Sequence, residues 1–122
     1  MSGVRALVVK CTAGEDAPER CAQAFTVAAT AIAAGAAVSL WLTGEAVWLA
    51  VPGRAEAFSL PHATPLAQLM DVVRANGQVT LCSQCAARRD LGADDVLDGI
   101  RIAGAAVFVE ESLADGAQAL VY

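Results

Sequence analysis

Apolar residues occur along this chain in short runs, each bounded by glycine, proline or polar residues. Such runs, with few charges among them, are typical of parallel strands that are covered on both faces. The runs alternate with longer segments in which apolar residues recur at helical spacing. The pattern predicts strands over residues 4–9, 37–42, 78–81, 105–109 and 118–122.

The segment between the first two strands has apolar residues at offsets of three, four and seven, which is typical of an amphipathic helix. We expect Asp16 and Glu19 to form a capping pair at the start of this helix, and Gly35 to end it. Its apolar face consists of Cys21, Ala24, Phe25, Ala28 and Ile32.

A second helix has clearer ends in the sequence. Thr64 is expected as its N-cap, Pro65 as its first residue and Gly77 as its terminator. Strands that alternate with helices predict an α/β fold with a parallel sheet and helices on both faces. A turn-rich surface connection is predicted over residues 54–64, a short helix over residues 93–97 and a helical turn over residues 111–114.

Composition narrows the class of protein. With 122 residues and 57% apolar content, the chain is expected to form one domain over residues 1–122. A net charge of −5 argues against nucleic-acid and anionic-lipid partners, because both need a basic surface. Without a secretory pattern at the start, the four cysteines indicate a reducing, cytoplasmic location.

Residues 21–44 contain no charge and are long enough to raise the question of a membrane span. Alanine makes up much of this stretch, Gly35 interrupts it, and residues 38–42 resemble a strand. We therefore expect a buried helix followed by a buried strand, and no membrane partner.

Cys82 and Cys85 lie where the strand over residues 78–81 meets a segment with helical composition. Amide groups at the start of a helix favour an anion, and Arg88 and Arg89 add positive charge. Cys82 is therefore expected to ionise near neutral pH and to act as a nucleophile. The carboxyl ends of parallel strands share one edge of a sheet, which places Cys11, Thr43 and Gly44 at the same edge.

Each cysteine also has a simpler interpretation. Cys82 and Cys85 can pack as small apolar residues, and zinc would need further Cys or His ligands from another subunit. We expect no metal or other cofactor. Cys21 is expected in the core, and Cys11 either faces the active edge as a second relay thiol or ends its strand, which we favour. His62 is expected at the surface.

Trp48 lies in an apolar segment, residues 46–51, that follows a glycine turn. The segment is either part of the core or a subunit contact, a setting in which tryptophan is enriched. The segment alone leaves both interpretations open.

Two segments resemble the DsrE-like family of small sulfur-relay proteins (DsrE/DsrF/TusD-type). Residues 38–50 are similar to its strand, glycine, acid and apolar segment, and residues 79–91 to its strand, cysteine and helix segment. The tail from Gly99 to Tyr122 also follows the ending of the family. The resemblance implies a three-layer α/β/α sandwich on a five-stranded parallel sheet, and assembly into trimers or hexamers. With this assembly implied, we favour a subunit contact for the segment around Trp48, and with it a homo-oligomer.

The resemblance also implies that Cys82 holds a persulfide, with Arg88 in the same motif, whereas Cys85 matches only a subgroup with paired cysteines. Three functions remain open. The first is sulfur transfer between donor and acceptor proteins or small thiols. The second is a dithiol/disulfide redox protein. The third is a structural or regulatory oligomer, which predicts that both thiols are buried and inert.

Overall fold

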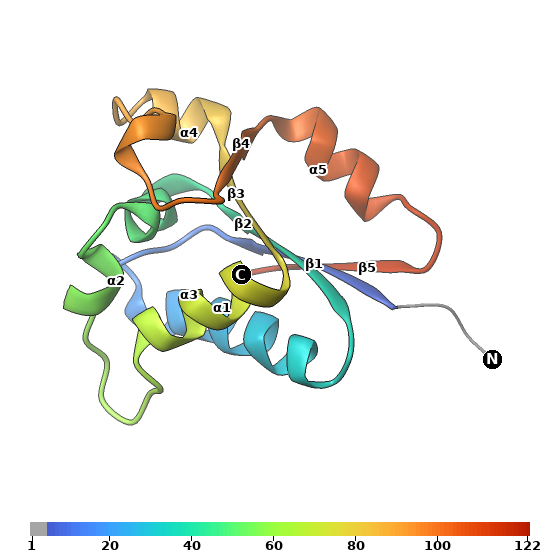
Figure 1. Ribbon diagram of the computed structural model, residues 1–122, viewed down its shortest axis with the longest axis horizontal. Coiled ribbons are helices and arrows are strands. Elements are labelled where there is room, and N and C mark those ends of the chain that lie inside the picture. Colours follow the sequence, from blue (N-terminus) through green and yellow to red (C-terminus); the bar gives the residue numbers. More distant parts are fainter. Residues whose placement is uncertain (1–4) are drawn as a thin grey trace.

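The computed structural model describes residues 5–122, which form one sheet of five parallel strands flanked by helices (Figure 1). The order of strands is β4-β3-β2-β1-β5, and every neighbouring pair is parallel. This arrangement confirms the predicted α/β fold; Val4, the expected first residue of the first strand, lies outside the described residues. The strands are β1 (Ala6–Cys11), β2 (Ala37–Leu42), β3 (Gln78–Cys82), β4 (Arg101–Ala103) and β5 (Ala117–Val121).

Helices cover the two faces of the sheet unequally. Helices α1 and α3 pack side by side on one face, whereas α5 lies on the other (Figure 1). The α-helices are α1 (Pro18–Ala33), α2 (Arg54–Ala57), α3 (Leu66–Asn76), α4 (Ser83–Ala87) and α5 (Ala105–Ser112), and two 3₁₀ helices are η1 (Gly44–Ala50) and η2 (Ala93–Asp95).

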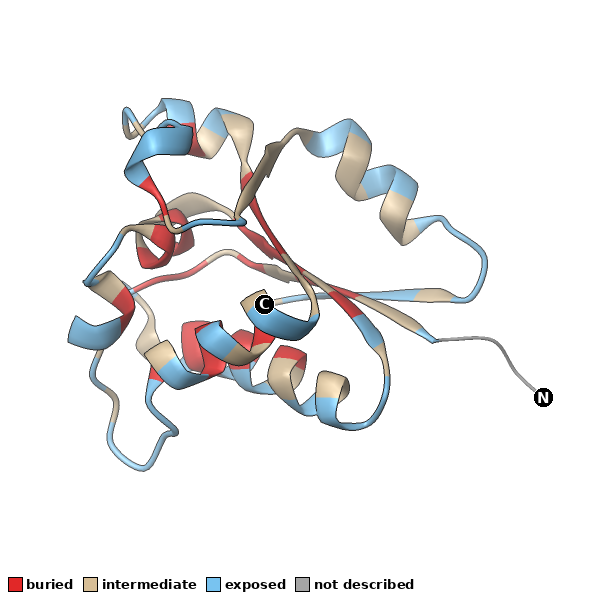
Figure 2. Cartoon of the chain, in the orientation of Figure 1, coloured by how far each residue is buried: buried red, intermediate tan, exposed pale blue. Residues whose placement is uncertain are grey.

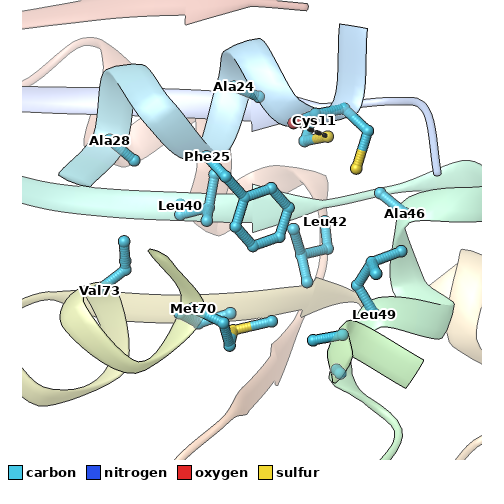
Figure 3. Packing of buried hydrophobic residues seen from close by; sticks show 14 of the residues in the cluster. Cys11, Ala24, Phe25, Ala28, Leu40, Leu42, Ala46, Leu49, Met70 and Val73 are labelled. Atoms are coloured by element: carbon cyan, nitrogen blue, oxygen red, sulfur yellow. Dashed lines mark hydrogen bonds between the residues drawn. The ribbon is translucent and has the colours of Figure 1, made fainter. Parts of the chain in front are cut away.

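The hydrophobic core fills the space between the sheet and the α1/α3 layer. Figure 3 shows Phe25 of α1 among strand residues such as Leu40 and Leu42, with Met70 of α3 close by. In contrast, α5 has no buried residue, and its layer contains little of the buried colour in Figure 2. We refer to these two sides of the sheet as the core face and the α5 face.

The prediction of a strand over residues 105–109 is wrong, because these residues begin α5. The fourth strand is Arg101–Ala103, which pairs with β3 and ends level with it. Phe108 and Glu111, three positions apart, both contact the sheet, as residues on one helical face do. These contacts outweigh the strand propensity of the apolar run.

The starts of both long helices also differ from the prediction. Ala17 precedes α1 and provides no side-chain cap, and the Asp16 carboxylate instead accepts a hydrogen bond from the Gly14 backbone N–H at 2.8 Å. Pro65 is the N-cap of α3, one residue later than expected. Gly77 does end α3, and its N–H donates to the Val73 carbonyl at 2.8 Å.

The segment around Trp48 belongs to the core of the single chain. Val47 and Leu49 are buried on either side of it, within η1. Trp48 itself is half-buried, and its ring lies 5.0 Å from the guanidinium of Arg54. The preference for a subunit contact at this segment is therefore wrong, because the chain itself covers the apolar side chains.

The uncharged stretch over residues 21–44 is divided between most of α1 and all of β2. In the described part of the chain, no helix is long and apolar enough to cross a membrane.

Candidate functional site

The first three strands end level at one edge of the sheet, as expected. Cys11 pairs with Leu42, and Leu42 pairs with Leu81, so that the loops after β1, β2 and β3 leave from the same edge. Cys82 is the last residue of β3 and pairs with Ala103 of β4. The dithiol segment therefore lies at the carboxyl edge, where open α/β sheets place functional groups.

Side chains alternate between the two faces of a strand, and this separates the cysteines. Cys11 shares the core face with Leu42 and Leu81, its neighbours in register. Cys82 lies one residue beyond Leu81 and shares the α5 face with Thr80. The structure thus brings Cys11 and Cys82 to the same edge but to opposite faces.

Cys82 is half-buried and is the N-cap residue of α4. Burial alone raises the pKa of its thiol, but the backbone N–H groups of Cys85 and Gln84, the Cys85 side chain and the charge of Lys10 together lower that pKa below its ordinary value. The amide contacts are loose, since Cys82 makes no regular side-chain capping hydrogen bond. The net effect favours the thiolate, which is the reactive form.

Cys85 lies in the first turn of α4 and is also half-buried. The two predicted arginines differ in their surroundings. Arg89 pairs with the Glu45 carboxylate at 2.9 Å and donates to the Cys85 carbonyl at 3.0 Å, so its charge is neutralised. Arg88 is exposed, with Nη1 4.0 Å from the Cys85 sulfur. The expectation that both arginines act on Cys82 is therefore replaced by a contribution from Lys10, which the sequence analysis did not identify.

Cys11 and Cys21 form a buried dithiol on the core face. Both are fully buried, and the Cys11 sulfur donates to the Ala13 carbonyl at 3.1 Å and lies 4.0 Å from the Cys21 carbonyl (Figure 3). The interaction between the two thiols lowers the pKa of Cys11 and, together with burial, raises that of Cys21. The helical spacing predicted the burial of Cys21, but no sequence signal pointed to this pairing.

Thr43 and Gly44 shape the turn at the end of β2. The Thr43 backbone N–H donates to the Cys11 carbonyl at 2.9 Å, and its hydroxyl donates to the same oxygen at 3.3 Å. Gly44 has φ +55°, and a Cβ atom there would lie 2.9 Å from the Thr12 carbonyl oxygen. These two residues therefore hold the ends of β1 and β2 together.

A polar cluster that the sequence analysis missed lies on the α5 face beneath α5. The Glu111 carboxylate accepts hydrogen bonds from Ser39 at 2.6 Å and from the Trp41 indole at 2.9 Å, and it pairs with Arg101. Arg101 also donates to the buried Thr80 hydroxyl at 2.8 Å. Burial raises the pKa of Glu111, but these three donors outweigh it and lower that pKa. Ser39 and Trp41 alternate with apolar residues in β2, and this alternation was the sequence signal that could have revealed the cluster.

Other candidate chemistry lies away from the thiols. Residues 5–122 contain no group of three or more His, Cys, Asp or Glu residues that could hold a metal ion. A surface cleft of about 760 Å³ lies between α1 and the loop before α3, and no cysteine lines it. His62 borders this cleft and is exposed, as expected.

A comparison with protein families matches residues 6–121 to the model of the DsrE/DsrF-like family. The chain belongs to this family. The family is generally associated with sulfur relay. No curated protein sequence matches the chain significantly.

Two solved structures share the fold. The ychN protein from E. coli superposes with a TM-score of 0.81 at 17% identity, over 98% of this chain and 100% of that protein. MTH1491 from Methanobacterium thermoautotrophicum, described as a protein of unknown function, gives a TM-score of 0.72 at 10% identity over the same shares. At these identities the likeness shows the fold alone.

Proposed function

We propose that this protein is a sulfur carrier that accepts a sulfane sulfur on Cys82 and passes it to an acceptor. The Cys82 thiolate attacks the outer sulfur of a donor persulfide, R–S–SH. The S–S bond of the donor breaks, a new S–S bond forms on Cys82, and R–S⁻ leaves. The products are Cys82–S–SH and the donor thiolate, so no external oxidant or reductant is consumed.

The observation that carries this proposal is the partly exposed position of Cys82 together with its lowered pKa. The side chain is half-buried at the carboxyl edge, and its pKa is lowered by neighbouring amides, a neighbouring thiol and a positive charge. Burial in apolar surroundings raises the pKa of a thiol. The pKa of Cys11 is also lowered, by its contact with Cys21, but Cys11 is fully buried, whereas Cys82 is partly exposed and can be reached by a donor. Membership of a sulfur-relay family supports the same chemistry.

The interaction of the Cys85 side chain with Cys82 supports a role for Cys85 as the partner thiol. After sulfur has been loaded, the Cys85 thiolate can attack the inner sulfur of Cys82–S–SH, which releases HS⁻ and closes a disulfide. The same pair could cycle as a dithiol/disulfide redox centre without a persulfide, which is the second candidate function. All four cysteines are free. Both functions require free thiols in the resting state of the protein, in a reducing compartment such as the cytoplasm.

A homo-oligomer, trimeric or hexameric, is part of the proposal, and its contact surface is reassigned from Trp48 to α5 and β5. The large apolar residues that remain exposed lie in α5, just after it, and in the edge strand β5. The exposed fractions are 48% for Val109, 78% for Leu113, 41% for Leu120 and 64% for Val121. A surface of this kind is typical of a protein contact.

The test is mass spectrometry of the reduced protein after exposure to glutathione persulfide. We expect an added mass of one sulfur atom on Cys82, no addition in Cys82→Ser, and a longer-lived addition in Cys85→Ser because no second thiol discharges it. Cys21→Ala serves as the control, since Cys21 is buried on the core face.

The redox alternative gives a different pattern. It predicts a Cys82–Cys85 disulfide after exposure to oxidised glutathione, together with no persulfide in Cys85→Ser. If neither cysteine gains sulfur and neither reacts with alkylating agents in the folded protein, the carrier function is excluded and the inert oligomer becomes the better interpretation.

A further inference from the structure

Lys10 is the only lysine in the chain, and it lies on the α5 face of β1. It pairs in register with Trp41, which in turn pairs with Thr80. Thr80 precedes Cys82 by two residues on the same strand, so Lys10 and Cys82 share one face of the sheet. The lysine side chain thus lies on the same face of the sheet as the thiol, and Lys10 is one residue before the end of β1 at the carboxyl edge.

The position of the ammonium group is set by α5. Lys10 Nζ lies 4.0 Å from the ring centroid of Phe108, a cation–π contact. Phe108 is held in turn by Trp41, because their rings meet edge to face at a centroid distance of 5.5 Å. The helix therefore supplies an aromatic surface against which a half-buried ammonium rests.

The other charges near Cys82 are balanced or point away. Arg101 is paired with Glu111 on the same face, and Arg89 of the segment after α4 is paired with Glu45 of η1. Arg88 is exposed beside Cys85. Among the described residues, Lys10 makes no ion pair with a carboxylate, so its charge remains available to an anion on the α5 face.

We propose that Lys10 is the electrostatic partner of the sulfur anion at Cys82, first as the thiolate and then as the persulfide, and that Phe108 positions it. This inference rests on the proposed carrier function. Persulfides are stronger acids than thiols, so Cys82–S–SH ionises to Cys82–S–S⁻ and keeps a negative charge on the sheet face that carries Lys10. The lowering of the Cys82 pKa by the charge of Lys10 is consistent with this role.

The placement also predicts which donors react best. An ammonium near the reacting sulfur attracts anionic donors. Thiosulfate is one such probe: the Cys82 thiolate attacks its outer sulfur, sulfite leaves, and Cys82–S–S⁻ remains. Lys10 is therefore expected to raise the rate with thiosulfate more than the rate with an uncharged organic trisulfide, R–S–S–S–R. The Cys82 thiolate attacks the central sulfur of the trisulfide, one S–S bond breaks, R–S⁻ leaves, and the mixed trisulfide Cys82–S–S–S–R remains.

The experiment measures the rate of Cys82 alkylation by iodoacetamide against pH, in a Cys85→Ser background that isolates one exposed thiol. We expect Lys10→Met to lower the rate at pH 7 by roughly two- to ten-fold, the range for one charge acting across a partly hydrated site. The profile should move to higher pH and reach the same limiting rate. Lys10→Arg should restore most of the rate at pH 7.

Two further variants keep the test decisive. Phe108→Leu removes the ring and retains the charge, and we expect a profile between those of the parent and Lys10→Met. Arg20→Met removes an exposed charge from α1 and should leave the profile unchanged. Circular dichroism of every variant separates loss of charge from loss of fold.

The inference is overturned if Lys10→Met and the parent have the same pH profile, or if Lys10→Arg behaves as Lys10→Met does. An unchanged profile in Phe108→Leu removes the positioning role. Failure of the carrier function is distinguishable: Cys82 would then gain no sulfur from thiosulfate or glutathione persulfide, although the alkylation profile still shifted with Lys10.

Discussion

The indole N–H of Trp41 donates a hydrogen bond of 2.9 Å to the carboxylate of Glu111, and this bond joins the sheet to α5. The same carboxylate accepts from Ser39 and pairs with Arg101, so three residues of two strands converge on one side chain of the helix. Because α5 has no buried residue, this polar cluster takes the place that apolar packing has on the core face. The position of α5, and with it that of Phe108 over Lys10, therefore depends on Glu111.

We expect Glu111→Gln to destabilise the fold by about 1–3 kcal/mol, because it removes charge-assisted hydrogen bonds and leaves Arg101 without its anion. Urea unfolding at pH 7 measures this change. Fluorescence of Trp41, recorded in a Trp48→Phe background, should report the loss of the indole contact. Glu110→Gln is the matched control, since its side chain is exposed on the same helix. Equal stability of the two variants would contradict the assignment.

The same group predicts a pH dependence. The folded state lowers the pKa of Glu111, so the contribution of Glu111 to stability is present above its unfolded pKa and is lost as pH falls through the folded value. We therefore expect the difference in stability between the parent and Glu111→Gln to be constant near neutrality and to shrink in acid, below about pH 4. A difference that is unchanged at pH 3 would contradict this prediction.

The sequence predicted the elements whose signals are local. Residues 37–42 form β2 with the expected bounds, and Gly77 ends α3 as expected. The sequence failed where distant contacts decide: residues 105–109 have strand propensity but form a helix, because Phe108 and Glu111 find partners on the sheet. Such partners are far away in the chain, so local propensity cannot reveal them.

The candidate site was predictable to a similar extent. The strand-to-helix junction identified Cys82 and Cys85, because a thiol at a helix start has a recognisable sequence context. Lys10 was not identified, since its relation to Cys82 depends on the strand order β3-β2-β1 and on the face that each side chain takes. The segment around Trp48 was misjudged for the same reason: η1 packs against β3 and α4, which lie far along the chain.

The buried dithiol of Cys11 and Cys21 should be silent in the native protein. Both side chains are fully buried, and the pKa of Cys21 is raised by its contact with Cys11 and by burial. In a Cys82→Ser, Cys85→Ser variant, we expect labelling by a thiol reagent to be at least about a hundred-fold slower than in the parent, since it requires local or global opening. Addition of urea to the unfolding range should release both thiols together. Native labelling as fast as that of Cys82 would contradict the assignment of these residues to the core.

The exposed apolar surface of α5 and β5 leads to the last prediction. Leu113 is 78% exposed in the single chain, so a charged residue there costs the monomer little. If this surface is the subunit contact, Leu113→Glu places an unpaired carboxylate in each interface, which costs several kcal/mol per site. We expect light scattering at micromolar concentration to give a trimer or hexamer for the parent and a folded monomer for Leu113→Glu. Gln68→Glu, on the exposed side of α3 in the opposite layer, should assemble as the parent does. A parent that is monomeric, or a Leu113→Glu variant that remains assembled, would remove this surface from the proposed interface. Every factor of ten in dissociation constant corresponds to about 1.4 kcal/mol. A cost of several kcal/mol per site is therefore large enough to separate the subunits at micromolar concentration.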